Sequence, residues 1–125
     1  MKIALVTDDH ETISAHYGRA QFYEIFTIEA GKVIARESIA RSIQQVVSLD
    51  AGLETEGKHH HHDHNAMIVP IADCEVLLAR GMGNGAHLSL KEHGIQPIIT
   101  DIRELQAAVD AYLAGTLVDH PERLH

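Results

Sequence analysis

The sequence predicts an α/β domain in three layers, α/β/α, built on a mixed sheet of about five strands. The chain opens with a short apolar run, 2–7, which is typical of a buried central strand. The aromatic and β-branched stretch 22–39 alternates around a glycine-containing turn and predicts an antiparallel hairpin. After residue 65, strand-like and helix-like segments alternate, which favours parallel strands covered by helices.

The second half supplies the remaining elements. Residues 66–71 read as a helix that begins near Asp63 or Asn65, with a bend or last turn at Pro70. The apolar run 75–80 predicts a second buried strand, and 95–100 a third. Between them, 87–93 is expected to be helical and to end at Gly94.

The last helix has the clearest pattern. Asp101 and Glu104 form a capping-box-like start, an apolar face follows, and Gly115 ends the helix. Residues 116–125 are expected to be loosely held. We therefore predict a single domain over 1–117, with a histidine-rich loop at 58–65, and a C-terminal tail at 118–125. The stretch 43–49 is compatible with a strand, a short helix or a loop.

Composition and charge limit the possible partners. The chain has 125 residues, 45% of them hydrophobic, which is enough for a sizeable core. Asp and Glu number 18 against 10 Lys and Arg, and the net charge of −8 repels nucleic-acid phosphates. Without a signal peptide or a stretch long enough to span a bilayer, the expected location is cytoplasmic, with no membrane partner. Cys74, the single cysteine, excludes an internal disulfide and is expected to be a small buried hydrophobe.

Five of the eight residues in the run 58–65 are histidines, whose imidazoles are strong ligands for borderline metals. In a helix, His60 and His64 would share a face, whereas in an extended chain alternate histidines would. The alternatives are a solvated polar loop or a misplaced purification tag, and the interior position argues against the tag. The candidate metal ligands are His59, His60, His61, His62 and His64.

The loop after the first strand, 12–20, collects chemically useful groups where ligands of open α/β sheets bind. Arg19 suits an anion with several acceptor atoms, Ser14 could donate beside it, and His16 adds an imidazole. The alternative is that Gly18 makes a turn and Arg19 pairs with a surface carboxylate.

A glycine-rich turn, 81–86, follows the second buried strand and precedes a helix. Its alternate glycines would let backbone N–H groups approach an anion. Its spacing matches neither the dinucleotide fingerprint nor the Walker loop, and the alternative is a tight turn that needs glycine. The candidate binding residues here are Gly81, Met82, Gly83, Asn84 and Gly85. His87 could face the same cleft, whereas His93, His120 and His125 are expected at the surface.

The stretch 14–20, followed by an aromatic strand, resembles the S-x-H-F-G-R-A motif of the dinitrogenase iron–molybdenum cofactor biosynthesis family. The entry to a strand at 73–76, the turn 81–83 and the ending 107–115 add to the resemblance, which covers roughly residues 1–117. Tyr17 stands where the motif usually has Phe, a change that conserves shape.

The resemblance implies a ribonuclease-H-like α/β/α fold and non-catalytic binding or carriage of an anionic metal–sulfur cluster, of Fe/Mo or Mo/Cu type, or of its metal. It transfers to Ser14, His16, Gly18 and Arg19 by motif, with His16 as a metal ligand, and to the histidines at 59–64 by position. The implied partners are cofactor-assembly or acceptor proteins, for a chain that is a monomer or weak homodimer.

Two other functions remain open. The histidines could serve a Ni, Zn or Cu buffer or sensor that holds no cluster. The run 8–11, Asp-Asp-His-Glu, could serve a metal-dependent phosphohydrolase or nuclease, but enzymes of the ribonuclease-H type place an aspartate within the first strand, and 2–7 contains none. Cluster carriage requires that the histidine run, the arginine loop and the glycine turn share one edge of the sheet.

Overall fold

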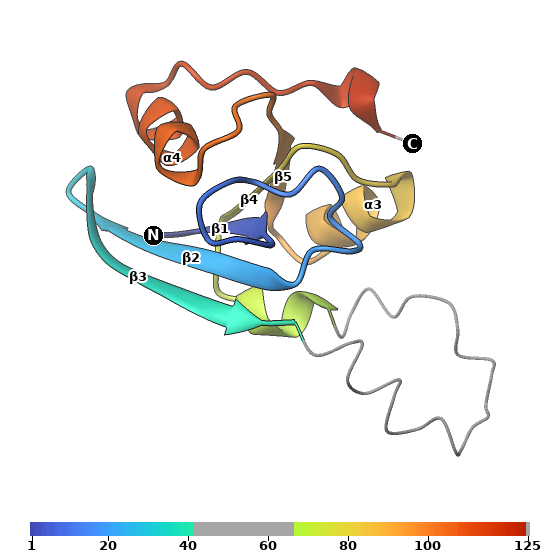
Figure 1. The fold of residues 1–125 in the computed structure, drawn as a ribbon, viewed down its shortest axis with the longest axis horizontal. Helices are drawn as coiled ribbons and strands as arrows, with labels where there is room; N and C mark the ends of the chain where they lie inside the picture. The colour runs from blue at the N-terminus through green and yellow to red at the C-terminus, as the bar shows by residue number, and fades with distance from the viewer. Residues whose placement is uncertain (42–66, 125) are drawn as a thin grey trace.

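The computed structural model describes residues 1–41 and 67–124. Its strands form one mixed sheet in the order β3-β2-β1-β4-β5 (Figure 1). β1 pairs antiparallel with β2 and parallel with β4, and β4 pairs parallel with β5. The strands are β1 (Lys2–Thr7), β2 (Phe22–Glu29), β3 (Lys32–Ala40), β4 (Val76–Ala79) and β5 (Gln96–Ile99). This arrangement confirms the predicted fold class.

Helices cover both faces of the sheet. The crossovers from β3 to β4 and from β4 to β5 join strands that run in the same direction, and both step the same way across the sheet. With the usual right-handed connection, they place the 3₁₀ turn η3 (Val69–Ile71) and helix α3 (Asn84–Glu92) on one face. Helix α4 (Leu105–Ala114) lies on the other side of the sheet from η3 (Figure 1). No helix among the described residues is long and apolar enough to cross a membrane.

Burial explains why the central strands could be predicted from their apolar sequences. All four residues of β4 and five of the six in β1 are buried, because both faces of these strands are covered. β3, at the sheet edge, is mostly exposed. The β2–β3 hairpin turns through Ala30 and Gly31, both with positive φ, which is the backbone that a two-residue hairpin turn requires.

Both helices begin at a different residue from the one predicted. α3 begins at Asn84 rather than 87, so the second half of the glycine-rich turn forms its first helical turn; Gly94 follows its end, as predicted. The capping box at Asp101 and Glu104 is wrong. Glu104 has extended backbone and makes no side-chain cap, because the chain there pairs with the loop after β1: the Ile13 N–H donates to the Arg103 carbonyl over 2.7 Å.

Segment 66–71 is only partly the predicted helix. Residues 67 and 68 are helical, but Pro70 occupies the start of a 3₁₀ turn, η3, which ends the element. The ambiguous stretch 43–49 and the histidine run 58–65 lie outside the described residues.

The C-terminal segment is not loosely held. The backbone N–H of Ile99 donates to the Asp119 carboxylate over 2.9 Å, and the His120 N–H donates to the Ile99 carbonyl over 2.8 Å. These bonds extend the free edge of β5, and Leu124 then bridges Met82. His120 is half-buried rather than fully at the surface, and its ring lies 2.8 Å from the exposed Glu122 carboxylate in the 3₁₀ turn η4 (Pro121–Arg123).

We expect Leu78→Ala to lower the free energy of unfolding by roughly 2–5 kcal/mol, because Leu78 is fully buried in the central strand β4. Leu88→Ala is the matched control: Leu88 is 57% exposed, and its truncation should cost less than about 0.5 kcal/mol. Urea unfolding of both variants measures the difference. Equal effects would contradict the layer arrangement.

Candidate functional site

The carboxyl ends of the parallel strands meet at one edge of the sheet. β1, β4 and β5 run in the same direction, and the antiparallel register pairs Thr7 with Phe22 and Phe22 with Ala40. The loops that follow β1 and β4, the start of β2 and the end of β3 therefore gather at this edge, where open α/β sheets bind their ligands. We refer to residues 13–20 as the motif loop.

The motif loop is a tight turn fixed by its own backbone. The Ser14 N–H donates to the Val6 carbonyl over 2.8 Å, beside the isolated antiparallel bridge between Thr7 and Ile13. The Ser14 hydroxyl accepts from the His16 N–H over 3.2 Å. The His16 carbonyl in turn accepts from the N–H groups of Arg19 and Ala20, both at 3.1 Å. Ser14, 9% exposed, thus shapes the turn from within.

The motif loop and the glycine-rich turn are hydrogen-bonded to each other. The Tyr17 N–H donates to the Gly81 carbonyl over 3.0 Å, and the Arg80 N–H donates to the Ser14 carbonyl over 3.3 Å. The two segments therefore lie together, as the sequence led us to expect. The third partner in that expectation, 59–64, lies outside the described residues.

The groups suited to ligand binding face outward from the loop. His16, Gly18 and Arg19 are all exposed. A Cβ atom added at Gly18 would meet nothing within 4 Å, and its φ is not positive, so neither packing nor backbone conformation in the described chain requires glycine. The open space beside Gly18 is a surface that a ligand could approach closely.

The glycine-rich turn contributes backbone rather than side chains. Gly81 is buried, and Met82, 1% exposed, packs in the core. Gly83 is the N-cap of α3, with Asn84 and Gly85 exposed in the first turn. The early N–H groups of a helix have no intrahelical acceptors and carry partial positive charge, so they suit an anion. His87, one turn further, is half-buried, and this burial, with the nearby Lys91 charge, lowers its pKa.

Sequence reasoning missed two arginines at this edge. Nη1 of Arg41, directly after β3, donates to the carbonyls of Tyr17 and Ala20. Nη1 of Arg80, directly after β4, donates to the Ile13 carbonyl over 3.4 Å. The available signal was position: each is a lone basic residue at the carboxyl-edge end of a strand.

A buried tyrosine pair fixes both chain segments that flank residues 42–66. The hydroxyls of Tyr17 and Tyr23 lie 2.9 Å apart, and Tyr23 donates to the Met67 carbonyl over 2.7 Å. The Arg41 guanidinium lies 4.9 and 4.8 Å from the centroids of the two rings. Burial raises the pKa of both phenols, which remain neutral. Arg41 and Met67 therefore both lie beside the motif loop.

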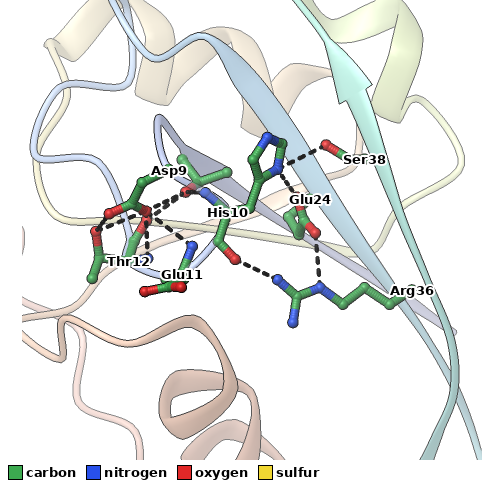
Figure 2. A network of polar contacts seen from close by, with 8 residues as sticks. Asp9, His10, Glu11, Thr12, Glu24, Arg36 and Ser38 are labelled. Atoms are coloured by element: carbon green, nitrogen blue, oxygen red, sulfur yellow. Dashed lines mark hydrogen bonds and ion pairs between the residues drawn. The ribbon is translucent and has the colours of Figure 1, made fainter.

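Asp9, from the acidic run 8–11, serves the conformation of its own loop. Its carboxylate accepts from the N–H groups of Thr12 and Glu11 over 2.8 and 2.9 Å, and also from the Thr12 hydroxyl (Figure 2). These bonds hold the pKa of Asp9 well below its usual range. In the chain segments 1–41 and 67–124, no group of three or more His, Cys, Asp or Glu side chains has the spacing to hold a metal ion.

His10 belongs to a second polar network (Figure 2). The Glu24 carboxylate, almost fully buried in β2, accepts from Arg36 Nε over 2.7 Å and lies 3.2 Å from His10 Nδ1. His10 Nδ1 also lies 3.2 Å from the Ser38 hydroxyl. Burial alone would raise the pKa of Glu24, but the hydrogen bonds from Arg36 and His10 outweigh it and lower the pKa. This network ties the loop after β1 to β2 and β3.

Cys74 is buried, as predicted. Burial, with the nearby Asp73 charge, raises the pKa of its thiol to about 12. The thiol therefore stays protonated, and a protonated thiol is a poor metal ligand.

Comparison with known proteins gives one family. A family model described as dinitrogenase iron-molybdenum cofactor matches residues 1–115. No curated protein sequence gives a significant match.

Several solved structures share the fold, and three of them illustrate the likeness. The apo form of the orange protein from Desulfovibrio gigas is 19% identical, with a TM-score of 0.70 over 96% of this chain and 92% of that one. A Methanocaldococcus jannaschii protein provisionally named a dinitrogenase is 12% identical, with a TM-score of 0.69 over 97% and 95%. A Thermotoga protein provisionally named NifB is 20% identical, with a TM-score of 0.64 over 94% and 91%. At these identities the likeness shows the fold.

We expect Glu24→Gln to destabilise the protein by about 1–3 kcal/mol at neutral pH, because the change removes a buried, hydrogen-bonded charge. Since the folded-state pKa of Glu24 is lowered, its contribution is present above pH 4.5 and is lost as the pH falls through the folded value. Unfolding curves from pH 7 to 2.5 should converge with those of the wild type in acid. Glu29→Gln, at the exposed hairpin, should match the wild type at every pH.

Proposed function

Because this chain belongs to the dinitrogenase iron-molybdenum cofactor family, we propose that it binds and carries an anionic metal–sulfur cluster, or its metal, during cofactor assembly. The cargo would be of Fe/Mo or Mo/Cu type, and the protein would catalyse no reaction on it. The domain over 1–117 would act in the cytoplasm, as a monomer or weak homodimer, and exchange cargo with cofactor-assembly or acceptor proteins.

One observation carries the proposal: the motif loop is locked against the glycine-rich turn by backbone hydrogen bonds, while its His16, Gly18 and Arg19 face outward. A loop fixed by its backbone presents these groups in one geometry, which lowers the entropic cost of binding. The space beside Gly18 is open, and any side chain at this position would occupy it. Bulky cargo could therefore approach the backbone closely here.

The donor types suit such cargo. The His16 imidazole would bind a metal, as would imidazoles from His59–His62 and His64, on the segment attached through Arg41 and Met67 beside the motif loop. Arg19 would contact sulfur or oxygen atoms of the cluster, and the amides of Gly83, Asn84 and Gly85 at the start of α3 would add N–H donors.

A histidine-rich buffer or sensor for Ni, Zn or Cu is the second candidate. The five histidines at 59–62 and 64 favour it. Within 1–41 and 67–124 no group of three or more His, Cys, Asp or Glu side chains could hold a metal ion, so a three-ligand ion site would have to draw on residues beyond those segments. The two functions differ in their need for Arg19, which a cation buffer does not use.

Protein purified from its native host should carry Fe, Mo or Cu together with sulfide, measured by elemental analysis and visible absorption. Arg19→Ala and Gly18→Ala should lower this cluster content several-fold, because the first removes the anion contact and the second fills the approach space. Both variants should keep the wild-type unfolding curve and Zn²⁺ uptake. Ions without sulfide, equal in wild type and variants, would establish the buffer instead.

Metal binding should weaken as the pH falls below about 6, because imidazole must lose its proton before it can bind a metal. Equilibrium dialysis of the full chain with Zn²⁺ between pH 7.5 and 5 measures the effect. His16→Ala should lower the Zn²⁺ affinity at pH 7.5. His93→Ala should not, because His93 is the C-cap of α3, at the end of the helix away from the glycine-rich turn. A flat pH profile would remove histidine from the mechanism.

A further inference from the structure

We propose that Arg41 and Arg80 form a cationic platform beneath the motif loop, which makes the site select ligands that carry two or more negative charges. The ligand class would be tetrahedral oxo- or thiometallate dianions and larger clusters built from them. This inference rests on the proposed function and specifies the charge of its cargo.

The two guanidinium groups flank the motif loop on either side of β1. Arg41 follows β3 and Arg80 follows β4, and in the sheet order these strands lie on opposite sides of β1, from which the loop emerges. Within residues 1–41 and 67–124, the guanidinium groups of both arginines donate to loop carbonyls: Arg41 to Tyr17 and Ala20, and Arg80 to Ile13. The loop is therefore held by its carbonyl oxygens.

Neither charge is neutralised in the described part of the molecule. No carboxylate of residues 1–41 or 67–124 lies within 4.0 Å of either guanidinium, although Arg36 and Lys2 each have one, at 2.7 and 3.0 Å. Nε and Nη2 of Arg41 and Nε of Arg80 are buried and have no hydrogen-bond partner among the described residues. In a chain with a net charge of −8, two partly buried cations under one loop that no carboxylate of the described segments pairs are unexpected.

Aromatic stacking stabilises one of these cations without cancelling its charge. The Arg41 guanidinium contacts the rings of Tyr17 and Tyr23, and a cation–π contact offsets part of the desolvation cost. Because burial keeps both phenols neutral, the full positive charge of Arg41 persists beneath the loop.

The platform would act through the field that it creates rather than by contact. The unpartnered nitrogen atoms are buried, so a ligand beside Gly18 and Arg19 would meet the exposed side of the loop and the positive potential behind it. Coulomb energy is proportional to ligand charge, so removal of one guanidinium should cost a dianion twice the free energy that it costs a monoanion.

The test compares molybdate and perrhenate, tetrahedral oxoanions of charge 2− and 1−, by equilibrium dialysis against the full-length protein. Arg41→Gln and Arg80→Gln, whose amides can still donate to the loop carbonyls, should each lower molybdate affinity about tenfold and perrhenate affinity about threefold. Arg41→Lys should largely restore the preference for the dianion. Lys32→Gln, at the hairpin on the opposite edge, removes the same charge and should leave both affinities unchanged.

An equal loss for both anions would show that the arginines only hold the loop, and no loss for either would also overturn the inference. The molybdate and perrhenate affinities are compared within each variant, so a partly disordered loop, which would weaken both, cannot imitate charge selectivity. If Arg41→Gln fails to fold, Arg80→Gln still provides the test. Wild-type protein that holds a cluster from its host but does not prefer molybdate would refute the platform alone. Absence of host-derived cluster would refute the proposed function.

Discussion

The parallel pairing of β1 with β4 is the constraint on which the rest of the site depends. Its register, Ile3 opposite Val76 and Leu5 opposite Leu78, ends both strands at the same edge of the sheet. The loop after β1 and the turn after β4 then lie close enough for their backbones to bond directly, from Tyr17 to Gly81. A change of this register would separate the motif loop from the start of α3.

The two parts of the loop after β1 have different roles: one stabilises the fold, and the other presents side chains for binding. Asp9 closes the first part of the loop after β1, and Glu24 ties the same part to β2 and β3 through His10 and Arg36 (Figure 2). These groups are satisfied by one another and serve stability. In the second part of the loop, five backbone N–H groups are hydrogen-bonded, those of Ser14, His16, Tyr17, Arg19 and Ala20. The side chains of His16 and Arg19 are exposed, so they remain available for binding.

The electrostatics of the molecule differ between its whole surface and this edge. The chain is acidic overall, and the ion pairs of Lys and Arg among the described residues lie elsewhere: Lys2 with Asp73 where β1 and β4 begin, and Arg36 with Glu24 in the sheet. Around the motif loop, Arg41 and Arg80 turn toward carbonyl oxygens instead of carboxylates. The family of this chain is named for a metal cofactor, and positive charge around the motif loop would suit binding of an anionic ligand of that kind.

The sequence by itself determined the central strands, the hairpin and the motif loop, because each leaves a local pattern. Strands buried on both faces, such as β4, must be uniformly apolar, and the turn at Ala30 and Gly31 needs positive φ. Only the tertiary structure decided that Glu104 pairs across the chain instead of capping a helix, that Asp119 secures the C-terminal segment to β5, and that Arg41 and Arg80 lie beneath the motif loop. These features join residues far apart in the sequence. A local sequence pattern does not show which distant backbone groups will still need a hydrogen-bond partner once the chain has folded.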